Sequence, residues 1–165
     1  MKIDFALAKC QDNTERKLFG LCDDKKEQRA YLDETDGAKW IAVVVNEYEY
    51  SVTFTAIDHC IETKREDGKM DSRCDGFLNF NTTVIFIELK ERSGHGNAWV
   101  IEGEKQLRTS INYFKRSNED ENFTIKRAYI SNKEHPKFKE SQSARMDKFF
   151  NETGYILRIE NRIIL

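Results

Sequence analysis

Proline and glycine are scarce in this chain. It has one proline, Pro136, and eight glycines among 165 residues, and it contains no Pro/Gly/Ser-rich linker, internal repeat or low-complexity tract. Boundaries between domains usually fall in such linkers, and a chain of this length fits one domain of ordinary size. We therefore expect a single domain over residues 1–165, with the polar stretch 131–140 around Pro136 forming a loop.

Long apolar runs are also lacking. No stretch approaches the ~20 apolar residues that a membrane-spanning helix needs. Charged residues interrupt the N-terminal sequence from Met1 to Lys9, so no signal peptide is visible there. These features predict a protein without a membrane partner and with a cytoplasmic location.

The chain has few cysteines, and none of them forms a C-x-x-C pair. They are Cys10, Cys22, Cys60 and Cys74. Their spacing matches no usual zinc-ligand pattern, even when His59 is included. Because cytosolic proteins are kept reduced, we expect four reduced thiols that are mostly buried.

Charge of one sign is not in excess either. The 27 Lys and Arg residues nearly balance the 29 Asp and Glu residues, which leaves a formal net charge of −2. This balance argues against an obligate nucleic-acid binder, since neutralising phosphates usually requires a basic surface. A local basic face can still exist within a balanced total. The 39% hydrophobic content, which includes eleven Phe and six Tyr, favours a packed core over disorder.

Hydrophobic periodicity predicts the secondary structure. Apolar residues at roughly helical spacing predict one or two helices over 12–33, broken near Gly20. β-Branched or alternating runs predict strands at 40–45 and 51–57, and the polar segment 62–72 is expected to connect them to the next strands.

The second half of the chain is predicted to alternate helices and strands. Val100, Leu107, Ile111 and Phe114 indicate an amphipathic helix over 99–116. A strand at 125–131, a helix at 141–153 ended by Gly154, and one or two short strands within 155–165 follow. This order predicts an α/β (α+β) fold, in which a central mixed β-sheet is flanked by helices.

Residues 74–90 have the form of an antiparallel hairpin, because two apolar runs flank Asn81-Thr82. A two-residue turn there pairs Phe80 with Thr83, and the same register places Asp75 opposite Glu88. A four-residue turn from Phe80 to Thr83 gives the same pairing. An odd-length turn would instead put the two carboxylates on opposite faces of the sheet.

The end of this hairpin concentrates charge beside a buried strand. The apolar run 84–87 leads directly into Glu88 and Lys90, which share one face because residues two apart in a strand do so. Two facing carboxylates repel each other unless a cation lies between them, and their oxygen ligands suit Mg²⁺ or Mn²⁺. Such a metal can polarise a phosphoryl group and activate water, while Lys90 can orient the attacking water or stabilise the developing charge.

Asp75, the hairpin, the sequence Glu88-Leu89-Lys90 and the following helix together resemble the PD-(D/E)XK nuclease superfamily. The resemblance implies a restriction-endonuclease-like core with the order helix, three strands, helix, strand over about 12–131. It implies that Asp75 and Glu88 bind the metal and that Lys90 is catalytic. It also implies hydrolysis of phosphodiester bonds in nucleic acid, with DNA expected ahead of RNA. Cys74 stands where the family has proline.

The resemblance also indicates residues that contact substrate. Some members use a glutamine on the helix after the lysine strand, a part that Gln106 could play. Lys105 and Arg108 lie on the same helix in a basic stripe with Asn112 and Lys115, expected on the exposed side where a substrate backbone would lie. Lys126, Arg127, Lys133, Lys137 and Lys139 could extend this patch, and His95 could reach substrate from its glycine-flanked loop.

Many members of the superfamily take a further acid from the first helix. Glu15 and Glu27 are both candidates, and the sequence does not separate them. A homodimer would be the simplest way for so small a domain to cut two strands.

Three functional hypotheses follow from these residues. The chain is a metal-dependent nuclease, or a catalytically inactive relative of the same fold that binds nucleic acid or a protein partner. In the third, it is an interaction protein in which Asp75, Glu88 and Lys90 form a structural charge cluster.

Overall fold

The computed structural model describes residues 3–92, 96–134 and 142–165. The strands are β1 Gln11–Thr14, β2 Leu18–Cys22, β3 Tyr31–Asp33, β4 Ala42–Val45, β5 Val52–Ala56, β6 Gly76–Phe80, β7 Thr83–Lys90, β8 Ile125–Asn132, β9 Ile156–Arg158 and β10 Arg162–Ile164. The helices are α1 Ala98–Arg116 and α2 Ser143–Thr153, with short 3₁₀ turns η1 Ala8–Cys10, η2 Gly37–Lys39 and η3 Glu119–Asn122.

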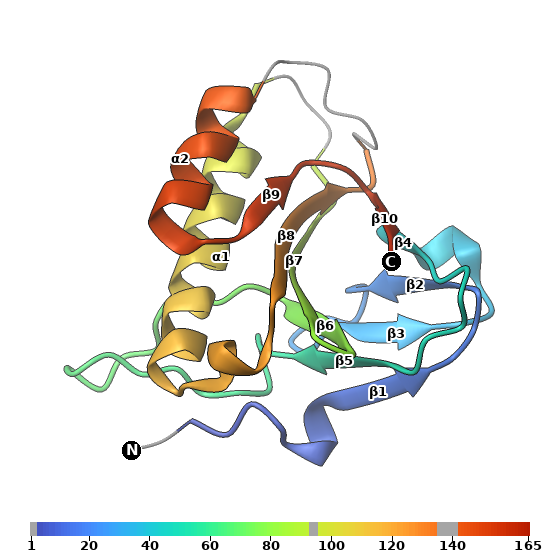
Figure 1. Cartoon of the computed structure of the whole chain (residues 1–165), viewed down its shortest axis with the longest axis horizontal. Coiled ribbons are helices and arrows are strands. Elements are labelled where there is room, and N and C mark those ends of the chain that lie inside the picture. The colour runs from blue at the N-terminus through green and yellow to red at the C-terminus, as the bar shows by residue number, and fades with distance from the viewer. Residues whose placement is uncertain (1–2, 93–95, 135–141) are drawn as a thin grey trace.

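The strands form two sheets. The larger sheet has six strands in the order β1-β5-β6-β7-β8-β9, and the smaller has four in the order β10-β4-β2-β3. Helices α1 and α2 cover one face of the larger sheet, and the smaller sheet lies on its other side (Figure 1). Strand β7 is therefore buried along its whole length.

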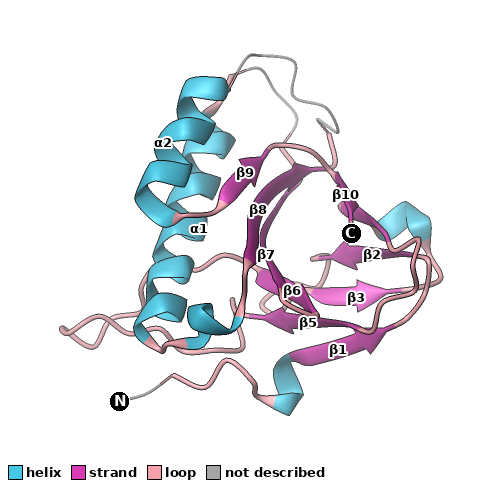
Figure 2. Cartoon of the chain, viewed as in Figure 1, coloured by secondary structure: helices cyan, strands magenta, loops and turns pink. Residues whose placement is uncertain are grey.

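Strand direction in the larger sheet changes at β7. Strands β1, β5, β6 and β7 are antiparallel neighbours, whereas β7, β8 and β9 run parallel. Parallel neighbours need a crossover connection, and α1 and α2 supply the two crossovers (Figure 2). The α+β class and the mixed sheet flanked by helices are confirmed, and three strands, a helix and a strand occur in the expected order as β5, β6, β7, α1 and β8.

The helices predicted over 12–33 are wrong, because this segment contains β1, β2 and β3. Strand β2 is covered on both faces, so residues Phe19 to Cys22 are all buried. A short strand of this kind has consecutive apolar residues, which at this length also fit helical spacing. In the described residues, the α-helix that the family resemblance implied before the three-strand unit is therefore absent, and strands β1 to β4 precede that unit.

The other predicted strands and helices are confirmed, with small shifts at their ends. Of the loop expected over 131–140, residues 131–132 belong to β8, and 135–140 lie outside the described residues. The expected strands at 40–45, 51–57 and 125–131 are β4, β5 and β8, and the C-terminal segment contains β9 and β10. Helix α2 ends at Gly154, whose φ of 80° is the left-handed conformation that favours glycine at this position. Segment 62–72 connects β5 to β6, with one isolated bridge between Lys64 and Met70.

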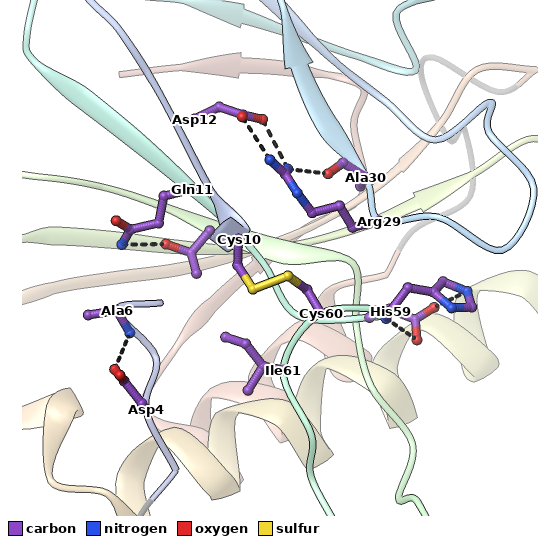
Figure 3. Close-up of a disulfide and its surroundings, with 12 residues drawn as sticks. Asp4, Ala6, Cys10, Gln11, Asp12, Arg29, Ala30, His59, Cys60 and Ile61 are labelled. Atoms are coloured by element: carbon purple, nitrogen blue, oxygen red, sulfur yellow. Dashed lines mark hydrogen bonds and ion pairs between the residues drawn. A yellow bond between two sulfur atoms is a disulfide. The ribbon is translucent and has the colours of Figure 1, made fainter. Parts of the chain in front are cut away.

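The expectation of four reduced thiols is wrong for one pair. Cys10 and Cys60 form a disulfide, with sulfur atoms 1.99 Å apart, across a sequence separation of 50 (Figure 3). Cys22 and Cys74 are free and buried, as expected. Only the folded chain brings Cys10 beside the end of β5, so spacing in the sequence could not reveal the pair. In the described part of the chain, no helix is both long and apolar enough to cross a membrane.

Candidate metal and catalytic site

The hairpin of β6 and β7 sets the geometry of the site. Phe80 pairs with Thr83 and Gly76 pairs with Ile87, which confirms the predicted register. Asn81 in the turn has a φ of 48°, a left-handed conformation that asparagine tolerates well. Continued by one residue, the same register places Asp75 opposite Glu88, on the sheet face that packs against α1.

Asp75 and Glu88 are held together in the interior, with residue exposures of 6% and 2%. Burial and the neighbouring Glu88 carboxylate raise the pKa of Asp75 well above its usual range. Burial also raises the pKa of Glu88, although hydrogen bonding to Asp75 and the charge of Lys90 oppose this shift. A hydrogen bond between the two carboxyl groups contributes to both shifts, raising the pKa of Asp75 and lowering that of Glu88. The backbone N–H of Leu89 donates to Asp75 Oδ2 at 2.7 Å and fixes its orientation.

Lys90 lies beside this pair and is also buried, with 7% of the residue exposed. Its Nζ is 3.3 Å from Glu88 Oε2 and 3.3 Å from Glu102 Oε1. It also donates to Gln106 Oε1 at 2.9 Å. The structure thus brings Gln106 to the predicted site, where it contacts the lysine.

Sequence reasoning missed Glu102, which lies one helical turn before Gln106 and shares its face of α1. Its side chain is 49% exposed and also lies 3.6 Å from Arg92 Nη2. The spacing of four residues between Glu102 and Gln106 could have indicated that Glu102 lies on the same helix face as Gln106.

Two further acids approach the pair from other elements. Asp58 follows β5, where its N–H donates to Cys74 O at 3.2 Å and its carboxylate lies 3.2 Å from Arg73 Nη2. Asp23 follows β2 in the smaller sheet. Although residue Asp23 is largely exposed, partial burial of its carboxyl group and the adjacent Asp75 carboxyl group raise its pKa to about 7. No local pattern connects these acids to the hairpin, because the two sheets must pack before Asp23 meets Asp75.

The other predicted site residues lie elsewhere. Lys105 is exposed on α1, whereas Arg108 is only 33% exposed because α2 covers it. Arg108 Nε lies 2.8 Å from Glu152 Oε2, and its guanidinium stacks 5.5 Å from the centre of the Phe149 ring. Lys115 donates to Thr153 O. The basic stripe on α1 is thus partly used to dock α2, while Leu107, Ile111 and Phe114 pack in the core as predicted.

Neither Glu15 nor Glu27 lies on a helix. Glu15 is exposed on the turn after β1, and Glu27 is exposed in the connection after β2, with a φ of 59°. The helix that was expected to carry one of them does not form. His95, His135, Lys137 and Lys139 lie outside the described residues.

Within residues 3–92, 96–134 and 142–165, no group of three or more His, Cys, Asp or Glu side chains is arranged to hold a metal ion. The donor set at the hairpin is therefore the pair Asp75 and Glu88. Mg²⁺ commonly binds through one or two carboxylates and completes its shell with waters and substrate phosphate oxygens. Glu88 and Glu102 both lie beside the Lys90 ammonium, and Asp75 lies beside Glu88. A divalent cation at the pair would be balanced by the Asp75 and Glu88 carboxylates.

Comparison with known proteins gives no match: no family model, no curated protein and no solved structure is significantly similar to this chain.

Proposed function

We propose that this protein is a divalent-metal-dependent nuclease of the PD-(D/E)XK type, which hydrolyses phosphodiester bonds in nucleic acid, with DNA preferred to RNA. The observation that carries the proposal is the buried Asp75–Glu88 pair, with the Lys90 ammonium 3.3 Å from Glu88 at the end of a central strand. Burying an ionised group costs free energy unless a partner compensates for the lost hydration. Perturbed carboxyl pKa values of this kind occur often at functional sites.

Each residue has a distinct part in the proposed reaction. Asp75 and Glu88 hold Mg²⁺ or Mn²⁺, and the Leu89 N–H keeps Asp75 oriented. The bound metal would supply Lewis-acid stabilisation of a phosphoryl oxygen and lower the pKa of water. Lys90 orients the attacking water and stabilises the negative charge that develops on the phosphate. Gln106 receives a hydrogen bond from the ammonium and holds it in place.

A cytoplasmic location and a homodimer complete the proposal. A dimer would place two such sites across a duplex from a domain too small to reach both strands.

The test is metal-dependent cleavage of a panel of single-stranded, duplex and branched DNA together with RNA. We expect cleavage with Mg²⁺ or Mn²⁺ by the wild type and by Lys148→Ala, an exposed control on α2. Glu88→Gln should abolish cleavage and weaken Mn²⁺ binding, because it removes the charge that holds the ion. Cleavage that survives in Glu88→Gln, Asp75→Asn and Lys90→Ala alike would show that this site is not responsible.

One observation favours a second candidate, a non-catalytic module of the same fold that binds nucleic acid or a protein partner. The Lys90 ammonium has three acceptors, Glu88, Glu102 and Gln106, and so is satisfied without substrate. Absence of cleavage and of Mn²⁺ binding, together with nucleic-acid binding that weakens steeply with salt, would support this candidate.

A further inference from the structure

The Cys10–Cys60 disulfide joins two segments that have different roles (Figure 3). Cys10 ends η1 and precedes β1, an edge strand whose hydrogen-bonded neighbour in the larger sheet is β5. The N-terminal segment before it is anchored by Phe5, whose ring lies 5.2 Å from that of Phe114. The disulfide thus ties this edge to the turn that follows β5.

The turn over residues 57–61 connects the disulfide to the candidate site. At one end, the N–H of Cys60 donates to Ile57 O at 3.1 Å. At the other end, the N–H of Ile57 donates to Asp75 O at 2.9 Å, and that of Asp58 donates to Cys74 O at 3.2 Å. The same short turn therefore carries one sulfur of the disulfide and bonds the backbone of a proposed metal ligand.

One residue of this turn has a left-handed backbone conformation. His59, directly before Cys60, has a φ of 61°, which is uncommon for a residue other than glycine. Such conformations persist where surrounding contacts impose them. Reducing the disulfide would remove one of the constraints on this turn.

The two cysteines differ in residue exposure. Cys10 is fully buried, whereas Cys60 is partly exposed beside the exposed His59. A thiolate from a dithiol reductant can attack Cys60 Sγ, which forms a mixed disulfide and releases Cys10 as the leaving thiolate. The second thiol of the reductant then displaces Cys60, so that two electrons and two protons pass to the protein and the reductant becomes a disulfide. A disulfide form of the same class of compound reverses the reaction.

We propose that the Cys10–Cys60 bond is a reversible redox switch. When formed, it stabilises the Asp75–Glu88 site through the turn 57–61. The effect on catalysis rests on the proposed nuclease function. In the oxidised protein, the disulfide keeps Ile57 and Asp58 hydrogen-bonded to the backbone of Asp75 and Cys74. In the reduced protein, these hydrogen bonds open more often and the proposed metal ligands become more mobile. Disulfides in reducing compartments are typically transient and redox-sensing, which reconciles this bond with the proposed cytoplasmic location.

The experiment compares oxidised wild type, wild type reduced with dithiothreitol, Cys10→Ser and Cys60→Ser, with Cys22→Ser as a control that keeps the disulfide. Amide hydrogen exchange at Ile57 and Asp58, Mn²⁺ affinity and nucleic-acid cleavage are measured on each. We expect reduction to speed exchange at these two amides by roughly tenfold or more and to weaken Mn²⁺ binding. Cys10→Ser and Cys60→Ser should have the exchange rates and Mn²⁺ affinity of the reduced wild type, and dithiothreitol should not change them. Cys22→Ser should respond to dithiothreitol as the wild type does.

Equal amide hydrogen exchange and equal Mn²⁺ affinity in the two redox forms would overturn the proposed redox switch. So would a circular dichroism spectrum showing that the reduced wild type unfolds as a whole, since the bond would then be a structural staple. Resistance of the oxidised protein to excess reduced glutathione would overturn it as well. Lack of cleavage in every form would count against the nuclease function instead. The amide hydrogen exchange of Ile57 and Asp58 would still test the redox switch.

Discussion

The β6–β7 hairpin and the smaller sheet differ in where their interaction partners lie along the chain. In the hairpin, each strand pairs with its immediate neighbour across a turn at Asn81. In the smaller sheet, β4 pairs in parallel with β10 at the far end of the sequence, and β2 pairs with β4 across an intervening strand. The hairpin can therefore be derived from a short stretch of sequence, whereas the smaller sheet depends on chain closure over long distances.

The two regions also use buried polar groups differently. At the hairpin end, carboxylates and an ammonium are buried beside one another. In the smaller sheet, the buried part of β2 is apolar, and Gly20 lies against the ring of Trp40. Substitutions should therefore affect chemistry at the first region and stability at the second.

The largest effect is expected at the site. On the proposed function, Glu88→Gln and Asp75→Asn should lower metal-dependent cleavage by roughly 1000-fold or more, since each removes one of the two charges proposed to hold the ion. Lys90→Ala should lower the rate by roughly 100-fold or more with little change in Mn²⁺ affinity. Calorimetric titration with Mn²⁺ beside single-turnover cleavage separates the two effects. A fall in metal affinity for Lys90→Ala equal to that for Glu88→Gln would contradict the assigned roles.

Reduction of the disulfide should give the largest change in stability. Opening a cross-link with a sequence separation of 50 costs roughly 4 kcal/mol in the chain-entropy account. For a domain of this size that corresponds to a fall in Tm of roughly 8–16 °C. Thermal unfolding of the wild type with and without dithiothreitol measures it, and Cys22→Ser, which retains the bond, serves as the control. An unchanged Tm would show that the bond constrains neither state.

Gly20→Ala should destabilise the smaller sheet without weakening the site. The added Cβ would lie 1.9 Å from Trp40 Cγ, so the indole must move. Overpacking of this kind costs roughly 1–3 kcal/mol. Urea unfolding measures the loss, and combining it with Trp40→Leu should recover part of it because the clash is removed. Gly76→Ala is the contrasting variant, since its Cβ would meet Thr55 O at 2.3 Å within the sheet that carries the site.

The smallest expected effect is a pH dependence in the presence of a chelator. The pKa of Asp23 is raised to about 7 by partial burial and by Asp75, and the pKa values of Asp75 and Glu88 are also raised. The folded chain then binds protons more tightly than the unfolded chain, so this stability is complete below the ordinary value of 3.8 and is lost as pH rises toward 7. Urea unfolding between these pH values should show the decline, and Asp23→Asn should reduce it. A pH dependence that Asp23→Asn leaves unchanged would contradict the raised pKa assigned to Asp23.

The sequence by itself determined the α+β class, the helices α1 and α2 and the register of the hairpin. An even-length turn between two apolar runs leaves little choice of pairing, because a slip of one residue would move every side chain to the other face. The same local rule placed Asp75, Glu88 and Lys90 together, and helical spacing placed Leu107 and Phe114 in the core.

Only the tertiary structure decided the smaller sheet, the disulfide and the surroundings of the site. Strand β2 was mistaken for a helix because burial on both faces erases the alternation that identifies a strand. Cys10 meets Cys60, and Asp23 meets Asp75, only after distant segments pack. For the same reason, Arg108, which was predicted to be exposed, instead contacts α2 through Glu152. Local spacing specifies which face a side chain takes, whereas its neighbours across that face are set by the packing of the whole chain.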